Sequence, residues 1–204
     1  MNIEDVFGLP VGVSTLTTLD CEKVISYLDN QSMVGMDGPE GEYTLNQQLL
    51  EEDIFKETKQ EVQELTLEYA QEVLCHDVKN IAITTSWANL THSDDFIRPH
   101  KHSNSYLSGC FYLNHGSNIN FYNPIDKQDL YMLCPVVNFD PHNKYTWGTA
   151  AVTPQANMLI MFPSGLAHGV DPSPTRRHSI AYNTMPLGPL GGETNTLNIR
   201  GVSK

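Results

Sequence analysis

Three histidines and an arginine-serine pair are the residues of this chain whose types and spacing could do chemistry. One residue separates His100 from His102, and His168, Arg177 and Ser179 follow in that order. In an extended strand, residues i and i+2 point to the same face, so the first two imidazoles could be directed at one point. Neighbouring ligands around an octahedral ion with bonds of about 2.1 Å lie roughly 3 Å apart, which such a pair can reach. The spacing permits a metal chelate, although the pair alone also fits two polar residues at a strand edge.

The other three candidates lie in the segment MLIMFPSGLAHGVDPSPTRRHSIAYN. If PSPT forms the turn of a hairpin, His168 lies on one strand, and Arg177 and Ser179 share a face of its partner strand. A redox-active iron needs ligands on one face and open positions for a bidentate co-substrate and dioxygen. An arginine and a serine can bind the far carboxylate of a dicarboxylic acid through charge-assisted hydrogen bonds. The five residues are therefore compatible with an iron centre and a carboxylate clamp.

Polar and aromatic side chains on the predicted strands could line the same cavity. Asn89 is an amide on an apolar strand, which needs a hydrogen-bond partner and could orient the co-substrate or the substrate. A tyrosine hydroxyl could support the co-substrate carboxylate, whereas aromatic residues at strand spacing more often pack in the core. The aromatic candidates are Trp87, Tyr106, Tyr112 and Tyr182.

The neighbours of Arg177 should not belong to the site. His178 is expected to point away from the face that carries Arg177 and Ser179, and Arg176 is expected to face solvent. A slip of one residue in strand register would exchange the two arginines. Arg177 is preferred because it completes the pattern R-x-S.

The spacing of hydrophobic residues, which predicts the elements that position these side chains, changes once along the sequence. Residues 21–30 and 45–76 carry helix-like spacing, and an edge strand is expected near residues 10–16. After Asp77, short β-rich runs alternate with Gly, Pro, Asn and Asp. Seven or so short strands behind helices predict a mainly β protein with N-terminal helices, and a jelly roll fits the strand count.

Length and composition favour one soluble domain. At 204 residues the chain suits a single domain over 1–204, with a helical buttress (1–77), a β core (78–186) and a C-terminal arm (187–204). The net charge of -12 opposes binding to nucleic acid, and no apolar run is long enough to cross a membrane. The acidic N-terminal residues predict an intracellular, cytoplasmic location. Oligomeric state, including a homo-oligomer, stays open.

The ordered motifs resemble the Fe(II)- and 2-oxoglutarate-dependent oxygenases, and most closely a family of them from phages and bacteria. The resemblance rests on Trp87 and Asn89, on His100 and His102, and on the phrases VFGLPVGVSTL, SGCFYLN, TPQANMLIMFPSGLAHGV and RHSIAYN. It implies a double-stranded β-helix, a jelly-roll or cupin-like fold, that uses Fe(II), 2-oxoglutarate and dioxygen. It also implies oxidative decarboxylation of 2-oxoglutarate coupled to the oxidation, usually the hydroxylation, of a substrate that the sequence does not identify.

Carried over onto this sequence, the resemblance implies that His100 and His168 are iron ligands and that Arg177 and Ser179 bind the 2-oxoglutarate C5 carboxylate. His102 departs from the family pattern, because most relatives have Asp or Glu there. Three neutral imidazoles would leave the bound ion at +2, which balances the 2-oxoglutarate dianion. In an alternative arrangement His102 is the first ligand and His100 only supports it. The remaining position would then go to water or to one of three nearby residues, Asp94, Asp95 or Asn104.

Two other functions remain open on the sequence. One is a cupin-like metalloenzyme that uses the three histidines without 2-oxoglutarate, and the other is a jelly-roll binding module in which the histidines are structural. Substrate contacts are expected in the long link at 123–149 and in the loop at 30–47, because long irregular segments are more often functional than accidental.

Overall fold

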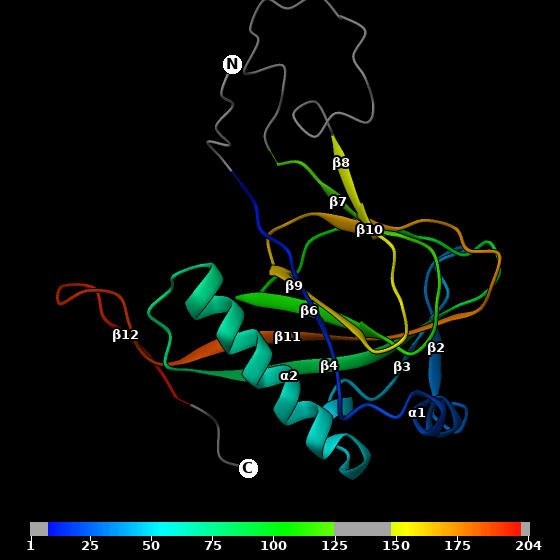
Figure 1. Ribbon diagram of the computed structural model, residues 1–204, viewed down its shortest axis with the longest axis horizontal. Helices are drawn as coiled ribbons and strands as arrows, with labels where there is room; N and C mark the ends of the chain where they lie inside the picture. The colour runs from blue at the N-terminus through cyan, green and yellow to red at the C-terminus, as the bar shows by residue number, and fades with distance from the viewer. Residues whose placement is uncertain (1–7, 125–147, 201–204) are drawn as a thin grey trace, which may run out of the picture.

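Two antiparallel sheets and a small set of helices make up the part of the chain that the computed structural model describes, residues 8–124 and 148–200 (Figure 1). The helical elements are α1 (Cys21–Leu28), η1 (Leu49–Glu51), η2 (Asp53–Phe55), α2 (Lys56–Glu68) and the π-helical turn η3 (Tyr69–Val73). The strands are β1 (Gly12–Thr15), β2 (Met33–Gly35), β3 (Glu42–Thr44), β4 (Asn80–Thr91), β5 (Ile97–His100), β6 (Leu107–Tyr112), β7 (Ile119–Tyr122), β8 (Thr149–Val152), β9 (Met158–Pro163), β10 (His168–Val170), β11 (Arg177–Leu190) and β12 (Leu197–Ile199).

The larger sheet has the strand order β1-β9-β6-β11-β4-β3-β2, with β12 paired to the end of β11. The smaller sheet has the order β5-β10-β7-β8. Apolar side chains from both sheets form one cluster, in which Ile119 and Phe121 of β7 join Ile160 and Phe162 of β9. Because this cluster takes members from both sheets, the sheets pack face to face as a sandwich.

The helices cover the outer face of the larger sheet, where α2 crosses β11 and β4 (Figure 1). The buried positions of α2 are Thr58, Val62 and Thr66, four residues apart, which places them on one face of the helix. The Thr66 hydroxyl lies 2.7 Å from the Tyr182 hydroxyl of β11. The helix therefore meets the sheet through a buried polar contact within a larger apolar cluster.

The mainly β architecture with N-terminal helices confirms the predicted fold class, with local differences. The region at 30–47 is not only a loop, because β2 and β3 form a hairpin that pairs with β4. Strand β11 runs past residue 186 to Leu190, and β12 folds back onto it. Most of the 123–149 link, residues 125–147, lies outside the described residues. None of the helices in the described ranges has the length and apolar character needed to span a membrane.

Candidate metal and co-substrate site

The central strand β11 supplies the floor of a cavity between the two sheets. Alternation along the strand sends Arg177 and Ser179 into the cavity. Register then aligns neighbouring strands: Ser179 pairs with Asn89 of β4 on one side and with Tyr112 of β6 on the other. These three residues form one row across the floor, and the next row contains Trp87, Ala181 and Cys110.

The smaller sheet supplies two of the three histidines. His168 at the start of β10 pairs directly with His100 at the end of β5. His102 lies just after β5, where its backbone N–H donates to the Ser164 carbonyl at 3.0 Å. Its ring stacks on Trp87 of the larger sheet, with ring centroids 5.8 Å apart. The antiparallel register therefore brings together residues that are far apart in the sequence.

The three rings present nitrogen atoms that could hold a metal ion. One ring nitrogen from each of His100, His102 and His168 lies within 4.8 Å of the others. The Nδ1 atoms of His100 and His168 lie 2.8 and 2.9 Å from the carbonyls of Arg98 and Leu166. Because a carbonyl can only accept, each Nδ1 donates and each neutral ring keeps its lone pair on Nε2.

The spacing and protonation of these nitrogens suit a cation. The Nε2 atoms of His102 and His168 lie 3.2 Å apart, close to the separation of roughly 3 Å between adjacent ligands of an octahedral ion. Burial, together with the nearby His100 and His102 rings, lowers the pKa of His168 to about 3. Burial and the His100 ring also lower the pKa of His102. The buried imidazoles are therefore neutral near pH 7, the form that binds metal.

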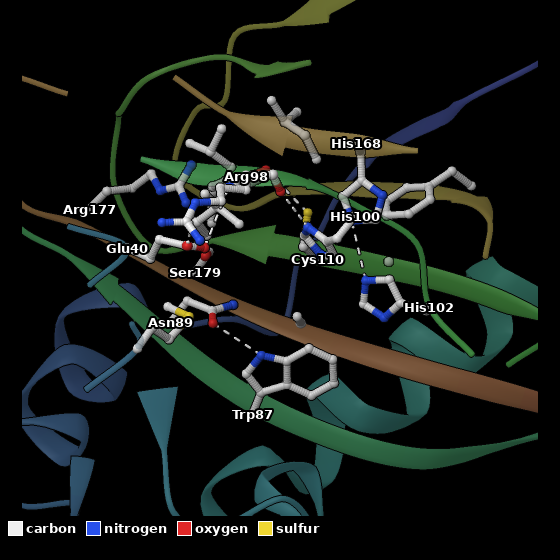
Figure 2. A pocket seen from close by; sticks show the side chains of 18 residues that line it. Glu40, Trp87, Asn89, Arg98, His100, His102, Cys110, His168, Arg177 and Ser179 are labelled. Atoms are coloured by element: carbon white, nitrogen blue, oxygen red, sulfur yellow. Dashed lines mark hydrogen bonds and ion pairs between the residues drawn. The ribbon is translucent and has the colours of Figure 1, made fainter. Parts of the chain in front are cut away.

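Arg177 lies at the other end of the cavity from the histidines, as Figure 2 shows. It is 2% exposed, and its Nε and Nη1 atoms are buried without a hydrogen-bond partner. Its guanidinium carbon lies 5.7 Å from the centre of the Tyr112 ring, and no carboxylate within the described ranges pairs with it. Burying an unpaired guanidinium costs free energy of folding unless an anion binds to it.

Gly116 allows Arg177 to lie where it does. A Cβ atom at Gly116 would sit 2.5 Å from Cδ and 2.7 Å from Cγ of the arginine. Any larger residue would push the side chain out of its place. The guanidinium is thus positioned by close packing against backbone as well as by its own strand.

The cavity has a volume of about 280 Å³ and collects most of the predicted residues. Its lining includes His100, His102, His168, Arg177, Ser179, Asn89, Tyr112 and Trp87. Contrary to the prediction, Tyr106 does not line this cavity. Its side chain packs against the helical cluster, and its hydroxyl lies 2.6 Å from His76 Nδ1. Tyr182 likewise faces the helices, since it occupies the opposite face of β11 from Ser179.

Two parts of the predicted geometry need correction. PSPT does not form a hairpin turn between the strands of His168 and Arg177, because β10 belongs to the smaller sheet and β11 to the larger one. The two residues meet across the sandwich instead. The extended strand also ends at His100, so His102 reaches the cluster from the following connection.

The expected places of the neighbouring residues agree with the structure. His178 lines a separate, smaller cavity on the other face of β11, and Arg176 is exposed and lies 3.5 Å from Asp29. Within the described ranges, the histidine cluster contains no carboxylate, so neither Asp94 nor Asp95 joins it.

Some lining residues had no place in the sequence prediction. Cys110 could have been found, because it shares a strand face with Tyr112. Arg98 similarly stands two residues before His100. Glu40 and Met36 line the cavity from the turn between β2 and β3. This turn lies within the loop at 30–47 where substrate contacts are expected, although the sequence did not single out either residue.

A family model described as "Putative 2OG-Fe(II) oxygenase" matches residues 85–183. The matched segment contains all three histidines of the cluster together with Arg177 and Ser179. Over this segment, which is just under half of the chain, the sequence is similar to the 2OG-Fe(II) oxygenase family. No curated protein matches it in sequence.

Solved structures of 2OG-Fe(II) oxygenases and related enzymes share this fold. HygX from Streptomyces hygroscopicus, solved with nickel, 2-oxoglutarate and hygromycin B bound, has a TM-score of 0.59 at 13% identity, over 87% of this chain and 83% of HygX. A Pseudomonas putida prolyl-4-hydroxylase has a TM-score of 0.58 at 14% identity, over 88% and 94%. The α-ketoglutarate-dependent epimerase SnoN has a TM-score of 0.59 at 14% identity, over 88% and 80%. These likenesses confirm the double-stranded β-helix.

Proposed function

We propose that this protein is a 2-oxoglutarate-dependent Fe(II) dioxygenase that couples decarboxylation of 2-oxoglutarate to hydroxylation of a substrate. The observation that carries the proposal is the buried guanidinium of Arg177, two of whose nitrogens have no hydrogen-bond partner among the described residues. It shares one cavity with three converging imidazoles. One end of the cavity suits a carboxylate, and the other suits a metal ion. A dicarboxylic acid that also chelates the ion would satisfy both ends.

The residues at the histidine end fit Fe(II). His100 and His168 would hold it through Nε2, the atom that their Nδ1 hydrogen bonds leave available, and the His102 ring would complete the set. Three neutral ligands leave the ion its full +2 charge, which matches the dianionic co-substrate. When bound, the iron supplies the redox chemistry by which 2-oxoglutarate and dioxygen yield succinate, carbon dioxide and an oxidised substrate.

The residues at the other end fit the C5 carboxylate of 2-oxoglutarate. Arg177 offers a fork of donors, and Ser179 and Asn89 in the adjoining row of the floor add polar groups beside it. Burial raises the pKa of Tyr112 well above its usual value, so its hydroxyl stays protonated. This chain would therefore orient the co-substrate and keep water from its charged end.

The comparisons support the same reading. HygX was solved with nickel and 2-oxoglutarate, and the fold also serves a prolyl hydroxylase and an epimerase, so the fold alone does not choose the reaction outcome.

We further propose that residues 1–204 form a single oxygenase domain, because both sheets contribute to one cavity. The three cysteines of the described ranges are free, which supports a reducing, cytoplasmic setting.

Anaerobic titration tests the proposal. Fe(II) is added first and 2-oxoglutarate second, and the visible charge-transfer band of the iron chelate is followed. We expect a band that saturates at one equivalent of each, and succinate after air is admitted. A protein that shows neither the band nor succinate is not a 2-oxoglutarate oxygenase. Metal-dependent turnover without 2-oxoglutarate would indicate the cupin-like alternative.

A further inference from the structure

The cavity contains one ion pair that the proposed chemistry does not use. Glu40 lies in the turn between β2 and β3, and Arg98 lies in β5, two residues before His100. The Arg98 Nε atom is 3.1 Å from Glu40 Oε1, as the dashed line in Figure 2 marks. The Arg98 backbone N–H also points to Glu40 Oε2 at 3.5 Å. Both residues line the cavity.

The backbone holds Glu40 firmly in this position. The N–H of Met36 donates to the Gly41 carbonyl at 2.9 Å and closes the turn, and the N–H of Phe96 donates to the Pro39 carbonyl at 2.9 Å and ties the turn to the chain just before β5. Gly41 has φ +83°, and a Cβ atom there would collide with the Leu90 carbonyl. The carboxylate is therefore presented to the cavity by a turn with little freedom to move.

The two partners differ strongly in exposure. The Glu40 side chain is 15% exposed, whereas that of Arg98 is 61% exposed. If the pair separates, Arg98 can turn into water at little cost, because its long stem lets the charged head leave the surface. Glu40 would remain as a largely buried carboxylate that needs a cation. The asymmetry favours a ligand that replaces Arg98, rather than one that replaces Glu40.

Charge and lining support the same choice. Arg177 already serves the anionic co-substrate, and the protein's net charge of -12 attracts cations over anions. Apolar side chains that also line the cavity could pack against a hydrocarbon stem: Met36, Ile97, Ile119 and Val170.

We propose that Glu40 recognises an ammonium or guanidinium group on an aliphatic stem of the primary substrate, and that Arg98 is its displaceable internal partner. This inference rests on the proposed function, and it names the class of substrate. The co-substrate carboxylate would bind near Arg177, the cation would bind at Glu40, and the stem would run from Glu40 toward the histidines.

Equilibrium dialysis at pH 8 with three matched probes, n-pentylamine, n-pentanol and pentanoate, tests it. The protein is used both without metal and anaerobically with Fe(II) and 2-oxoglutarate. We expect the amine to bind about tenfold or more tightly than either other probe, and Glu40→Gln to remove that preference. Arg98→Met should strengthen amine binding by about two- to fivefold, since it frees Glu40 from a partly exposed pair. A lysine capped at both backbone ends, run alongside, tells whether a protein side chain binds as well as a free amine.

The Lys59–Glu51 pair, 2.8 Å long and outside the cavity lining, provides the control. Glu51→Gln and Lys59→Met should leave binding of all three probes unchanged. Amine binding that survives Glu40→Gln would overturn the proposal. So would tighter binding of pentanoate that is lost in Arg98→Met, because Arg98 would then be the recognising group. The charge-transfer band in the iron-loaded samples tests the proposed function, whereas amine binding is also measured without metal and does not depend on the band. Failure of the Glu40 proposal can therefore be distinguished from failure of the proposed function.

Discussion

Replacing Arg177 by methionine should stabilise the metal-free protein while it destroys co-substrate binding. The side chain is 2% exposed, and its Nε and Nη1 atoms have no hydrogen-bond partner in the part of the chain that the structure describes. Replacing buried charges by apolar residues of similar volume often stabilises a protein by about 1–4 kcal/mol. Loss of the contact with the Tyr112 ring would offset about 0.5–1 kcal/mol of this, because the 5.7 Å separation is close to the limit of such a contact. The net gain of about 0–3.5 kcal/mol should raise Tm by up to about 14 °C for a chain of this size.

The same substitution removes the donors proposed for the 2-oxoglutarate C5 carboxylate. Each hydrogen bond to a charged group contributes about 1.5–3 kcal/mol, so losing two should weaken binding by about 10²- to 10⁴-fold. Differential scanning calorimetry of the metal-free protein gives the first quantity, and anaerobic titration of the iron chelate gives the second. Added 2-oxoglutarate with metal should raise Tm in the wild type and not in the variant.

Arg176→Met is the matched control, because that arginine is adjacent in sequence but exposed on the other side of the strand. It should leave 2-oxoglutarate affinity unchanged and move Tm little. If Arg177→Met has a lower Tm than the wild type, the unpaired guanidinium does not destabilise the metal-free protein. If it binds 2-oxoglutarate normally, Arg177 is not the carboxylate clamp.

Three further results follow from the same structure. His100→Ala should abolish the Fe(II) and 2-oxoglutarate band, whereas substantial iron affinity in this variant would support the arrangement in which His102 is the first ligand. Gly116→Ala should weaken 2-oxoglutarate binding by about tenfold or more and spare metal binding measured by equilibrium dialysis, because its Cβ would displace Arg177; unchanged affinity would contradict this packing. Although burial raises the pKa of Glu61, hydrogen bonds from Thr17–Thr18 lower it overall. The ionised carboxylate should therefore stabilise the fold above its unfolded pKa, and this contribution should be lost as pH falls through the lower folded pKa. In urea unfolding, the free energy of unfolding of Glu61→Gln should be lower than that of the wild type at pH 7, and the two values should converge in acid.

Local sequence pattern was sufficient for much of the fold. The helical spacing at 45–76 and the β-rich runs after Asp77 correspond to real elements, because hydrophobic period reflects which side of an element is buried. The hairpin of β2 and β3 was missed, since each strand has only three residues and little room to show alternation.

Within a single strand, the sequence by itself determined which side chains act together. Arg177 and Ser179 share a face because the period of a strand is two, and the same rule turns His178 and Tyr182 away from them. Such a rule needs no partner strand, so it holds before the tertiary structure is known.

Only the tertiary structure decided what those side chains face. His168 meets His100 through the pairing of β10 with β5, and it meets Arg177 across the sandwich rather than along a hairpin. For the same reason Tyr106, which was a candidate for the cavity, packs under the helices, whereas Glu40, which the sequence did not single out, lines the cavity. Pairing between distant strands depends on the packing of the whole core, and no short stretch of sequence contains that information.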